Sequence, residues 1–222
     1  MVSHEVRNPL TMVMGFAGEL RDGTEQFTPD EVSDLAGLMA DQTMEISNIF
    51  EDILVVACAD MGSLTIVPAE TDLNAEVDLV VRACVCAASI RDSIDVRATP
   101  SLAWADAGRV RQIVRNLISN AVRCGGDRVS VVVTQNGYEA SISVCDDGEG
   151  VPQADRARLF GAFQQSDTGR QVSGSVGIGL HVSRMLARAM GGDLAYRYEN
   201  GASSFELTLP GLVTAEYEPP LS

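Results

Sequence analysis

The stretch RVSVVVTQNGYEASISVC, residues 128–145, carries the most specific structural signal in this 222-residue chain. Apolar and polar residues alternate along much of RVSVVVTQ and again along YEASISVC. This period of two is typical of a half-buried strand. Asn136-Gly137 stands between the two runs, and Asn-Gly is the strongest short signal for a tight β-hairpin. The stretch therefore predicts an antiparallel pair of strands with one face covered by other elements.

Helical patterns flank this pair on both sides. Residues 106–123 carry apolar side chains at positions 110, 113, 114, 117, 118 and 121, which is the period of a helix with one buried face. Further helices are expected over 74–90 and 179–190, and short strands over 64–67, 94–98 and 101–105. The segments DLAYRYE and SSFELTLP predict a closing hairpin. The fold class is therefore α+β, with an antiparallel or mixed sheet and helices on one face.

The N-terminal part follows a purely helical pattern. A narrow apolar seam begins at Val6, and a second helix is expected after Gly23 and the pair Thr28-Pro29. The seam positions are Val6, Leu10, Val13, Ala17 and Leu20, then Val32, Leu35, Met39, Gln42, Ile46, Ile49, Ile53 and Val56. Two copies bury such a seam better than one, as a four-helix bundle. We expect a homodimer; the alternative is a single hairpin packed on the second domain.

The net charge of the chain changes near residue 62, where the purely helical pattern gives way to a mixture of helices and strands. Residues 1–62 hold 12 acidic residues and 2 arginines, a net of −10, and the remainder holds 19 and 14, a net of −5. We expect a helical hairpin over 1–62, an α/β domain over 63–211 and a disordered tail over 212–222. A net charge of −15 without any lysine argues against a nucleic-acid partner.

Apolar runs in the chain are too short to span a bilayer, and the N-terminus does not have the pattern of a secretory signal. We therefore expect no membrane segment and a cytoplasmic location. The alternative is that the chain is part of a longer, membrane-anchored protein.

The segment SHEVRNPLT, residues 3–11, holds one of the two histidines. On a helix, His4 and Asn8 lie on one face, four residues apart, and Glu5 is adjacent. An imidazole beside a carboxylate can act as a nucleophile, because the carboxylate accepts the ring proton while the other ring nitrogen attacks. The alternative is a polar helix surface without a chemical role.

Two further segments have the residue types of a nucleotide site. NLISNAVR places Asn116 and Asn120 on one helix face, and a neutral amide oxygen is a suitable ligand for Mg²⁺. CDDGEGVP follows a strand and contains Asp146, Gly148 and Gly150, where glycines allow close approach and the carboxylate could accept a hydrogen bond from an amine. Helix-surface asparagines and an ordinary turn are the alternatives.

A glycine-rich segment, GSVGIGLHVSR at 174–184, leads into a helix. Free amides and the positive end of the helix dipole there favour phosphate, although flexible loops have the same composition. The preceding residues, LFGAFQQSDTGRQVSG, have the composition of a hinged lid. His181 is expected to have a structural role or to contact that lid.

Taken in order, these motifs resemble those of the bacterial sensor histidine kinases of two-component systems, from Ser3 to about Pro210. The H-box is SHEVRNPLT, the N-box RQIVRNLISNAVR, the first glycine box DDGEGV, the F-box LFGAF and the second glycine box GIGL. The resemblance implies a dimeric helical bundle followed by a two-layer α/β sandwich that binds ATP and Mg²⁺. It also implies autophosphorylation and transfer of the phosphoryl group to an aspartate of a response-regulator receiver domain.

The resemblance implies roles for single residues as well. His4 would be the phosphoacceptor, Glu5 its general base, and Asn8 would position water for dephosphorylating the regulator. Asn120 would ligate Mg²⁺, and Asp146 would accept a hydrogen bond from the adenine amino group. The other implied nucleotide contacts are Asn116, Arg123, Gly148, Gly150, Phe160, Arg170, Gly177, Gly179 and Leu180.

Three positions depart from the family pattern. Arg123 and Cys124 stand where lysine and an aromatic residue usually continue the N-box, and Val176 stands where a small or hydroxyl residue is usual. One alternative is a kinase-inactive nucleotide-binding dimer that docks or dephosphorylates the regulator. Another is a different ATPase of the same superfamily, which would place a glutamate where this chain has Asn116. Transfer within one chain or across the dimer is left open.

Overall fold

A computed structural model of the protein describes residues 2–23, 27–87, 94–124, 128–161 and 178–212, with the backbone alone at 2–5, 85–87 and 124. The chain divides into two compact units. The first contains the residues up to Thr65 and the described parts of 153–182, and the second contains most of the remaining chain. All strands that the structure describes belong to the second unit, which also contains α-helices.

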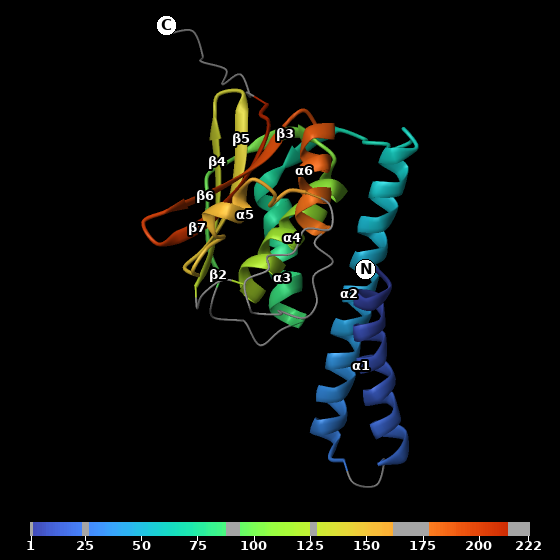
Figure 1. Ribbon diagram of the computed structural model, residues 1–222. Coiled ribbons are helices and arrows are strands. Elements are labelled where there is room, and N and C mark those ends of the chain that lie inside the picture. Colours follow the sequence, from blue (N-terminus) through green and yellow to red (C-terminus); the bar gives the residue numbers. More distant parts are fainter. Residues whose placement is uncertain (1, 24–26, 88–93, 125–127, 162–177, 213–222) are drawn as a thin grey trace, which may run out of the picture. The chain divides into compact units, whose positions relative to one another are not determined.

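Two long antiparallel helices form the N-terminal hairpin (Figure 1). Helix α1 spans Val2–Asp22, and helix α2 spans Pro29–Asp60. A capping box starts α2: the Thr28 hydroxyl accepts the N–H of Glu31, and the Glu31 carboxylate accepts the N–H of Thr28. The predicted helix end before Gly23 and the start at Thr28-Pro29 are confirmed. Within the described residues, no helix has both the length and the apolar character to cross a membrane.

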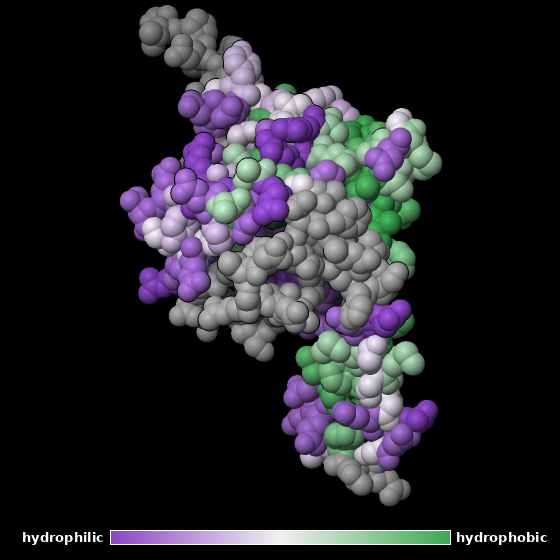
Figure 2. Space-filling model, in the orientation of Figure 1, coloured by the Kyte–Doolittle hydropathy of each residue, from purple (hydrophilic) through white to green (hydrophobic). Residues whose placement is uncertain are grey.

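The apolar seam of the hairpin is only partly covered. Among the described side chains of α1 and α2, the buried apolar ones are Pro9, Ile49 and Val55. Leu10 and Val32 occupy predicted seam positions and are 47% and 38% exposed. Figure 2 shows apolar side chains on the surface of the hairpin among hydrophilic ones. An exposed apolar surface of this kind suits contact with another protein surface, and the homodimer stays a prediction.

A five-stranded mixed sheet forms the frame of the second unit (Figure 1). The strand order is β2-β4-β5-β7-β6, with β2 parallel to β4 and the other neighbours antiparallel. The strands span Ile94–Ala98 (β2), Val129–Asn136 (β4), Glu139–Asp146 (β5), Asp193–Glu199 (β6) and Ala202–Pro210 (β7). Strands β1, Ala69–Asp72, and β3, Leu102–Ala105, make a separate antiparallel pair.

Helices cover one face of the five-stranded sheet (Figure 1). They are α3 (Leu73–Ala87), α4 (Ala107–Cys124) and α6 (Gly179–Ala189), and a single turn, α5 (Gln153–Arg156), precedes α6. The six apolar positions predicted for α4 are all buried, and every second residue of β5 and β7 is buried beneath the helices. The predicted α+β layer is confirmed; the helix expected over 74–90 is confirmed as far as Ala87, and α5 had no sequence signal.

The two hairpins of the sheet use different turns. In the β4–β5 hairpin Asn136 pairs with Glu139, so the loop is Gly137-Tyr138, with a φ of +60° at Gly137. Positive φ at the first loop position alone is typical of type II′. The β6–β7 loop, Asn200-Gly201, has φ of +53° and +79°, as in type I′. The hairpin predicted at 128–145 is confirmed, but its strand register places Asn136 in β4, outside the turn.

The strand expected at 64–67 is wrong. Strand β1 begins at Ala69 and pairs with β3, while the Val67 N–H donates to the Asp106 carboxylate at 3.0 Å. Residues 64–67 have a high β-propensity, but propensity alone does not form a strand. A strand forms only where a partner strand is available for pairing.

Candidate functional site

Asp146 is the last residue of β5 and lies on the face of the sheet that the helices cover. Its side chain is 7% exposed, and one carboxylate oxygen accepts the Gly148 N–H at 3.0 Å. Burial raises the pKa of this carboxyl above its ordinary value, because a buried charge loses hydration. The Gly148 N–H opposes the rise, the Asp147 carboxylate adds to it, and the Ser203 hydroxyl opposes it. A ligand amino group would stabilise the ionised form, so this position suits recognition of an amine.

The loop that follows Asp146 packs closely against β6. Gly150 has a φ of +70°, and a Cβ there would lie 2.3 Å from Cδ2 of Tyr198. The Val151 N–H donates to the Tyr196 hydroxyl at 2.8 Å, and the Tyr196 and Ser203 hydroxyls share a hydrogen bond of 3.1 Å. Glycine is therefore required at position 150 by contacts within the protein. The sequence predicted this glycine for approach to a ligand and did not reveal the two tyrosines, although strand alternation could have placed them on one face.

Asn116 and Asn120 lie one turn apart on the partly exposed side of α4, while Leu117 and Ile118 are buried. The Asn116 amide nitrogen donates to the Ser183 hydroxyl of α6 at 3.5 Å, which links the two helices. The placement of both amides on one face of α4 is as predicted.

Arg123 lies in the last turn of α4 and is exposed. Its Nε donates to the Ser119 carbonyl at 3.3 Å, so the guanidinium interacts with the carboxyl end of its own helix. Positive charge is favoured at that end by the helix dipole. This contact gives Arg123 a structural role that needs no nucleotide.

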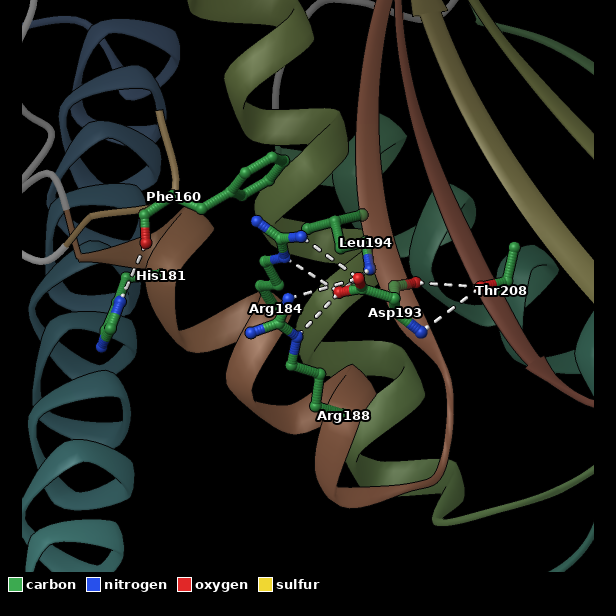
Figure 3. A network of polar contacts seen from close by, with 7 residues as sticks. All are labelled: Phe160, His181, Arg184, Arg188, Asp193, Leu194 and Thr208. Atoms are coloured by element: carbon green, nitrogen blue, oxygen red, sulfur yellow. Dashed lines mark hydrogen bonds and ion pairs between the residues drawn. The ribbon is translucent and has the colours of Figure 1, made fainter. Parts of the chain in front are cut away.

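Helix α6 begins with Gly179 and Leu180, which are both partly buried. On the next residue, His181, ring Nδ1 lies 3.0 Å from the carbonyl oxygen of Phe160 (Figure 3). His181 therefore has the structural contact that the sequence suggested, with the backbone of Phe160, one of the two phenylalanines of the F-box. Arg170 and Gly177, two further predicted site residues, lie outside the described residues.

The H-box lies on α1. His4 and Glu5 belong to the first turns of the helix, and their side chains lie outside the described part of the structure. Asn8 is exposed, and the helix continues through the buried Pro9. The exposed helix surface at Asn8 is available to a partner.

Metal binding at this site would depend on few protein ligands. Among the described residues, no group of three or more histidine, cysteine, aspartate or glutamate side chains could hold an ion. Mg²⁺ that is bound together with phosphates keeps several waters and takes one or two protein oxygens. The amide of Asn120, a hard oxygen donor on a partly exposed helix face, fits such an ion.

Asp146 also borders a surface cavity at the end of the sheet. Its lining comes from β2, β4, β5 and β7 and from residues beside them, and it includes Arg97, Arg128 and Cys145. Asp146 is the single predicted site residue in that lining, and neither asparagine of α4 contributes to it.

Family models match both parts of the chain. Residues 1–62 match the His Kinase A (phospho-acceptor) domain. Residues 105–212 match the family described as histidine kinase-, DNA gyrase B-, and HSP90-like ATPase. The first match contains His4, and the second contains α4, β5 and α6.

Individual relatives agree with these matches. The chain is 29% identical to the signal transduction histidine-protein kinase AfsQ2 of Streptomyces coelicolor and 31% identical to the probable sensor histidine kinase TcrY of Mycobacterium tuberculosis, in each case over 94% of its length. It spans only 40% and 44% of those two proteins.

Solved structures share the fold. Full-length ShkA in complex with AMPPNP is 28% identical, with a TM-score of 0.65 over 96% of this chain and 45% of that one. The histidine kinase AdeS of Acinetobacter baumannii is 24% identical, with a TM-score of 0.66 over 93% of this chain and 97% of that one, a likeness of fold alone.

Proposed function

Because the chain belongs to the histidine kinases of two-component signalling, we propose that it phosphorylates itself on His4 from ATP and passes the phosphoryl group to an aspartate of a response regulator. The observation that carries the proposal is the order of the two parts. A phospho-acceptor hairpin with a histidine beside a glutamate precedes an ATPase domain with a buried aspartate at a strand end. This order supports a proposed acceptor and a proposed nucleotide site on one chain.

Nucleotide binding is proposed to centre on Asp146. Its carboxylate accepts a hydrogen bond from the adenine amino group, and its burial supports this role because a donor restores the interactions that the buried charge has lost. On α4, Asn120 holds Mg²⁺ and Asn116 supports the phosphates. The remaining contacts proposed from the family pattern are Arg123, Gly148, Gly150, Phe160, Arg170, Gly177, Gly179 and Leu180.

Phosphoryl transfer follows from this arrangement. The bond from the γ-phosphorus of ATP to its bridging oxygen breaks as a ring nitrogen of His4 bonds to that phosphorus, and ADP leaves. Glu5, the adjacent residue, accepts the proton of the other ring nitrogen. Bound Mg²⁺ would supply charge neutralisation at the phosphates. The phosphohistidine then gives its phosphoryl group to a carboxylate oxygen of the regulator's aspartate, which restores His4.

The hairpin is proposed to act as a homodimer that also docks the regulator. Large apolar side chains on its surface support this, including Leu10, Phe50 and Leu54. Asn8, exposed on the turn after His4, is proposed to position water when the regulator is dephosphorylated.

The test is labelling with ATP that carries the label in its γ-phosphate, in the presence of Mg²⁺. Wild type, His4→Gln and Asp146→Asn are compared for base-stable, acid-labile label and for binding of a non-hydrolysable ATP analogue. We expect label in the wild type and none in His4→Gln, which should still bind the analogue. Asp146→Asn should bind it about ten- to a hundredfold more weakly, the size of a hydrogen bond to a charged group.

Two outcomes would count against the proposal. Label that persists in His4→Gln would remove His4 as the acceptor. Wild type that binds the analogue without becoming labelled would favour a kinase-inactive module that docks or dephosphorylates the regulator.

A further inference from the structure

The hydrogen bond between His181 and Phe160 joins two segments that are 21 residues apart in the chain. Ring Nδ1 of His181, in the first turn of α6, lies 3.0 Å from the Phe160 carbonyl oxygen. We propose that His181 is a positioning residue of the nucleotide site, which holds Phe160 beside the first turn of α6. This inference rests on the proposed ATP site, to which both residues' segments belong.

The hydrogen bond to the Phe160 carbonyl determines which ring nitrogen of His181 carries a hydrogen. A carbonyl oxygen can only accept a hydrogen bond, so Nδ1 must carry the hydrogen. Both the neutral Nδ1–H tautomer and the imidazolium meet this requirement, and Nε2 takes no part in the bond. The amide nitrogen of an asparagine branches from the side chain at the same place as Nδ1, and it could donate the same bond.

Of the two segments that this hydrogen bond joins, α6 is held in place by ion pairs. They connect the C-terminal half of the helix to Asp193, the first residue of β6 (Figure 3). Nε and Nη2 of Arg184 donate to the two carboxylate oxygens of Asp193 at 2.9 and 3.1 Å, and Arg188 reaches the same carboxylate at 3.1 and 3.4 Å. The Thr208 hydroxyl bonds the backbone N–H and carbonyl of Asp193, each at 3.3 Å. The apolar side of α6 is also buried, at Val182, Leu186 and Ala187.

The segment that carries Phe160 differs from α6 in its burial and in the hydrogen bonds that close its turns. None of the four residues of α5 is buried, and the turns that follow it are closed by local bonds from Arg158 N to the Asp155 carbonyl and from Gly161 N to the Arg158 carbonyl, at 3.0 and 2.8 Å. The Phe160 ring points away from the imidazole (Figure 3). Since the carbonyl and the side chain share one Cα, fixing the carbonyl also restricts the direction of the ring.

The consequence is a segment that is already ordered before nucleotide arrives. Without the His181 bond, Phe160 would lose one of the contacts that restrict it, and nucleotide binding would have to bear part of the cost of ordering it, which would reduce affinity. The bond from Nδ1 to a carbonyl gives the imidazole the part of placing Phe160. Loss of the bond should therefore raise KM for ATP and leave kcat for His4 phosphorylation nearly unchanged.

The experiment compares His181→Ala, His181→Asn and His181→Gln in the full chain. KM for ATP and kcat are measured from phosphohistidine formation, and binding of a non-hydrolysable ATP analogue is measured by calorimetry. We expect His181→Ala to raise KM and weaken analogue binding about two- to tenfold, the size of one neutral hydrogen bond. His181→Asn should restore both to within about twofold. His181→Gln, whose amide lies one atom farther out, should resemble His181→Ala.

Thermal unfolding without nucleotide is the control for a general loss of structure. Equal analogue binding by the asparagine and alanine variants would overturn the proposal, as would a fall in kcat with KM unchanged. If the wild type carries no label, the proposed kinase function fails, whereas the analogue-binding series still tests the role of His181.

Discussion

The hairpin and the α/β domain differ in how completely they bury their apolar side chains. Apart from Pro9, Ile49 and Val55, the apolar residues described in α1 and α2 are partly or fully exposed. Helix α4 alone buries six apolar side chains against the sheet. A sheet can cover the stripe of each helix that packs on it, whereas two helices cover only part of each other. The α/β domain is therefore expected to be stable as a single copy, and the hairpin to depend on a partner.

The largest expected effect concerns the core of the α/β domain. Leu117 is fully buried, so Leu117→Ala should lower the free energy of unfolding by about 2–5 kcal/mol through lost burial and a cavity. The matched control, Leu38→Ala on α2, removes a side chain that is 46% exposed and should change it by about 0.5 kcal/mol or less. Urea unfolding followed by far-ultraviolet circular dichroism, which reports the helices of both regions, measures both. Equal losses would mean that the two regions do not differ.

A second prediction concerns the partner of the hairpin. Leu10 lies on the predicted seam and Leu38 lies off it, yet their exposures are nearly equal, at 47% and 46%. If a second copy covers the seam, Leu10→Ala should weaken dimerisation about tenfold, because each subunit loses part of a buried leucine. Leu38→Ala should leave the dimer unchanged. Sedimentation equilibrium over a range of concentrations decides the matter, and a wild type that is monomeric throughout would argue against the bundle.

The smallest expected effect lies at the clamp on α6. Asp193→Asn removes a partly exposed carboxylate that Arg184 and Arg188 share, and it should cost about 1 kcal/mol. The Arg184 guanidinium, followed by that of Arg188, holds the pKa of Asp193 well below its ordinary value. The unfolded chain therefore binds a proton more readily, so this stabilisation is present at neutral pH, begins to be lost as pH falls below the ordinary pKa of an aspartate, and is lost further as pH falls toward the lowered pKa of the folded state.

Unfolding midpoints of wild type and Asp193→Asn, measured from pH 7 to pH 3, check this prediction. The difference between the two proteins should shrink as the pH falls. A difference that does not depend on pH would show that the carboxylate charge contributes nothing to the clamp.

Much of the candidate site was visible in the sequence because short-range patterns place its residues. The period of α4 puts Asn116 and Asn120 on one face, and the alternation of β5 puts Asp146 on the helix side at a strand end. The contacts of Gly150 were not visible, since Tyr196 and Tyr198 come from a strand more than 40 residues later. The bond from His181 to Phe160 was equally hidden, because nothing in the local sequence says which carbonyl a ring nitrogen will meet.

Local periodicity, caps and turn residues were enough to predict the two-helix hairpin, the helices of the α/β domain and its two β-hairpins. These features depend on residues within one or two turns of each other, so the sequence records them directly. Strand order, the position of β1, the turn type at Gly137 and the anchoring of α6 became clear only in the folded chain. Each of these depends on which distant segment supplies a partner for backbone groups and charged side chains that must not be left unpaired.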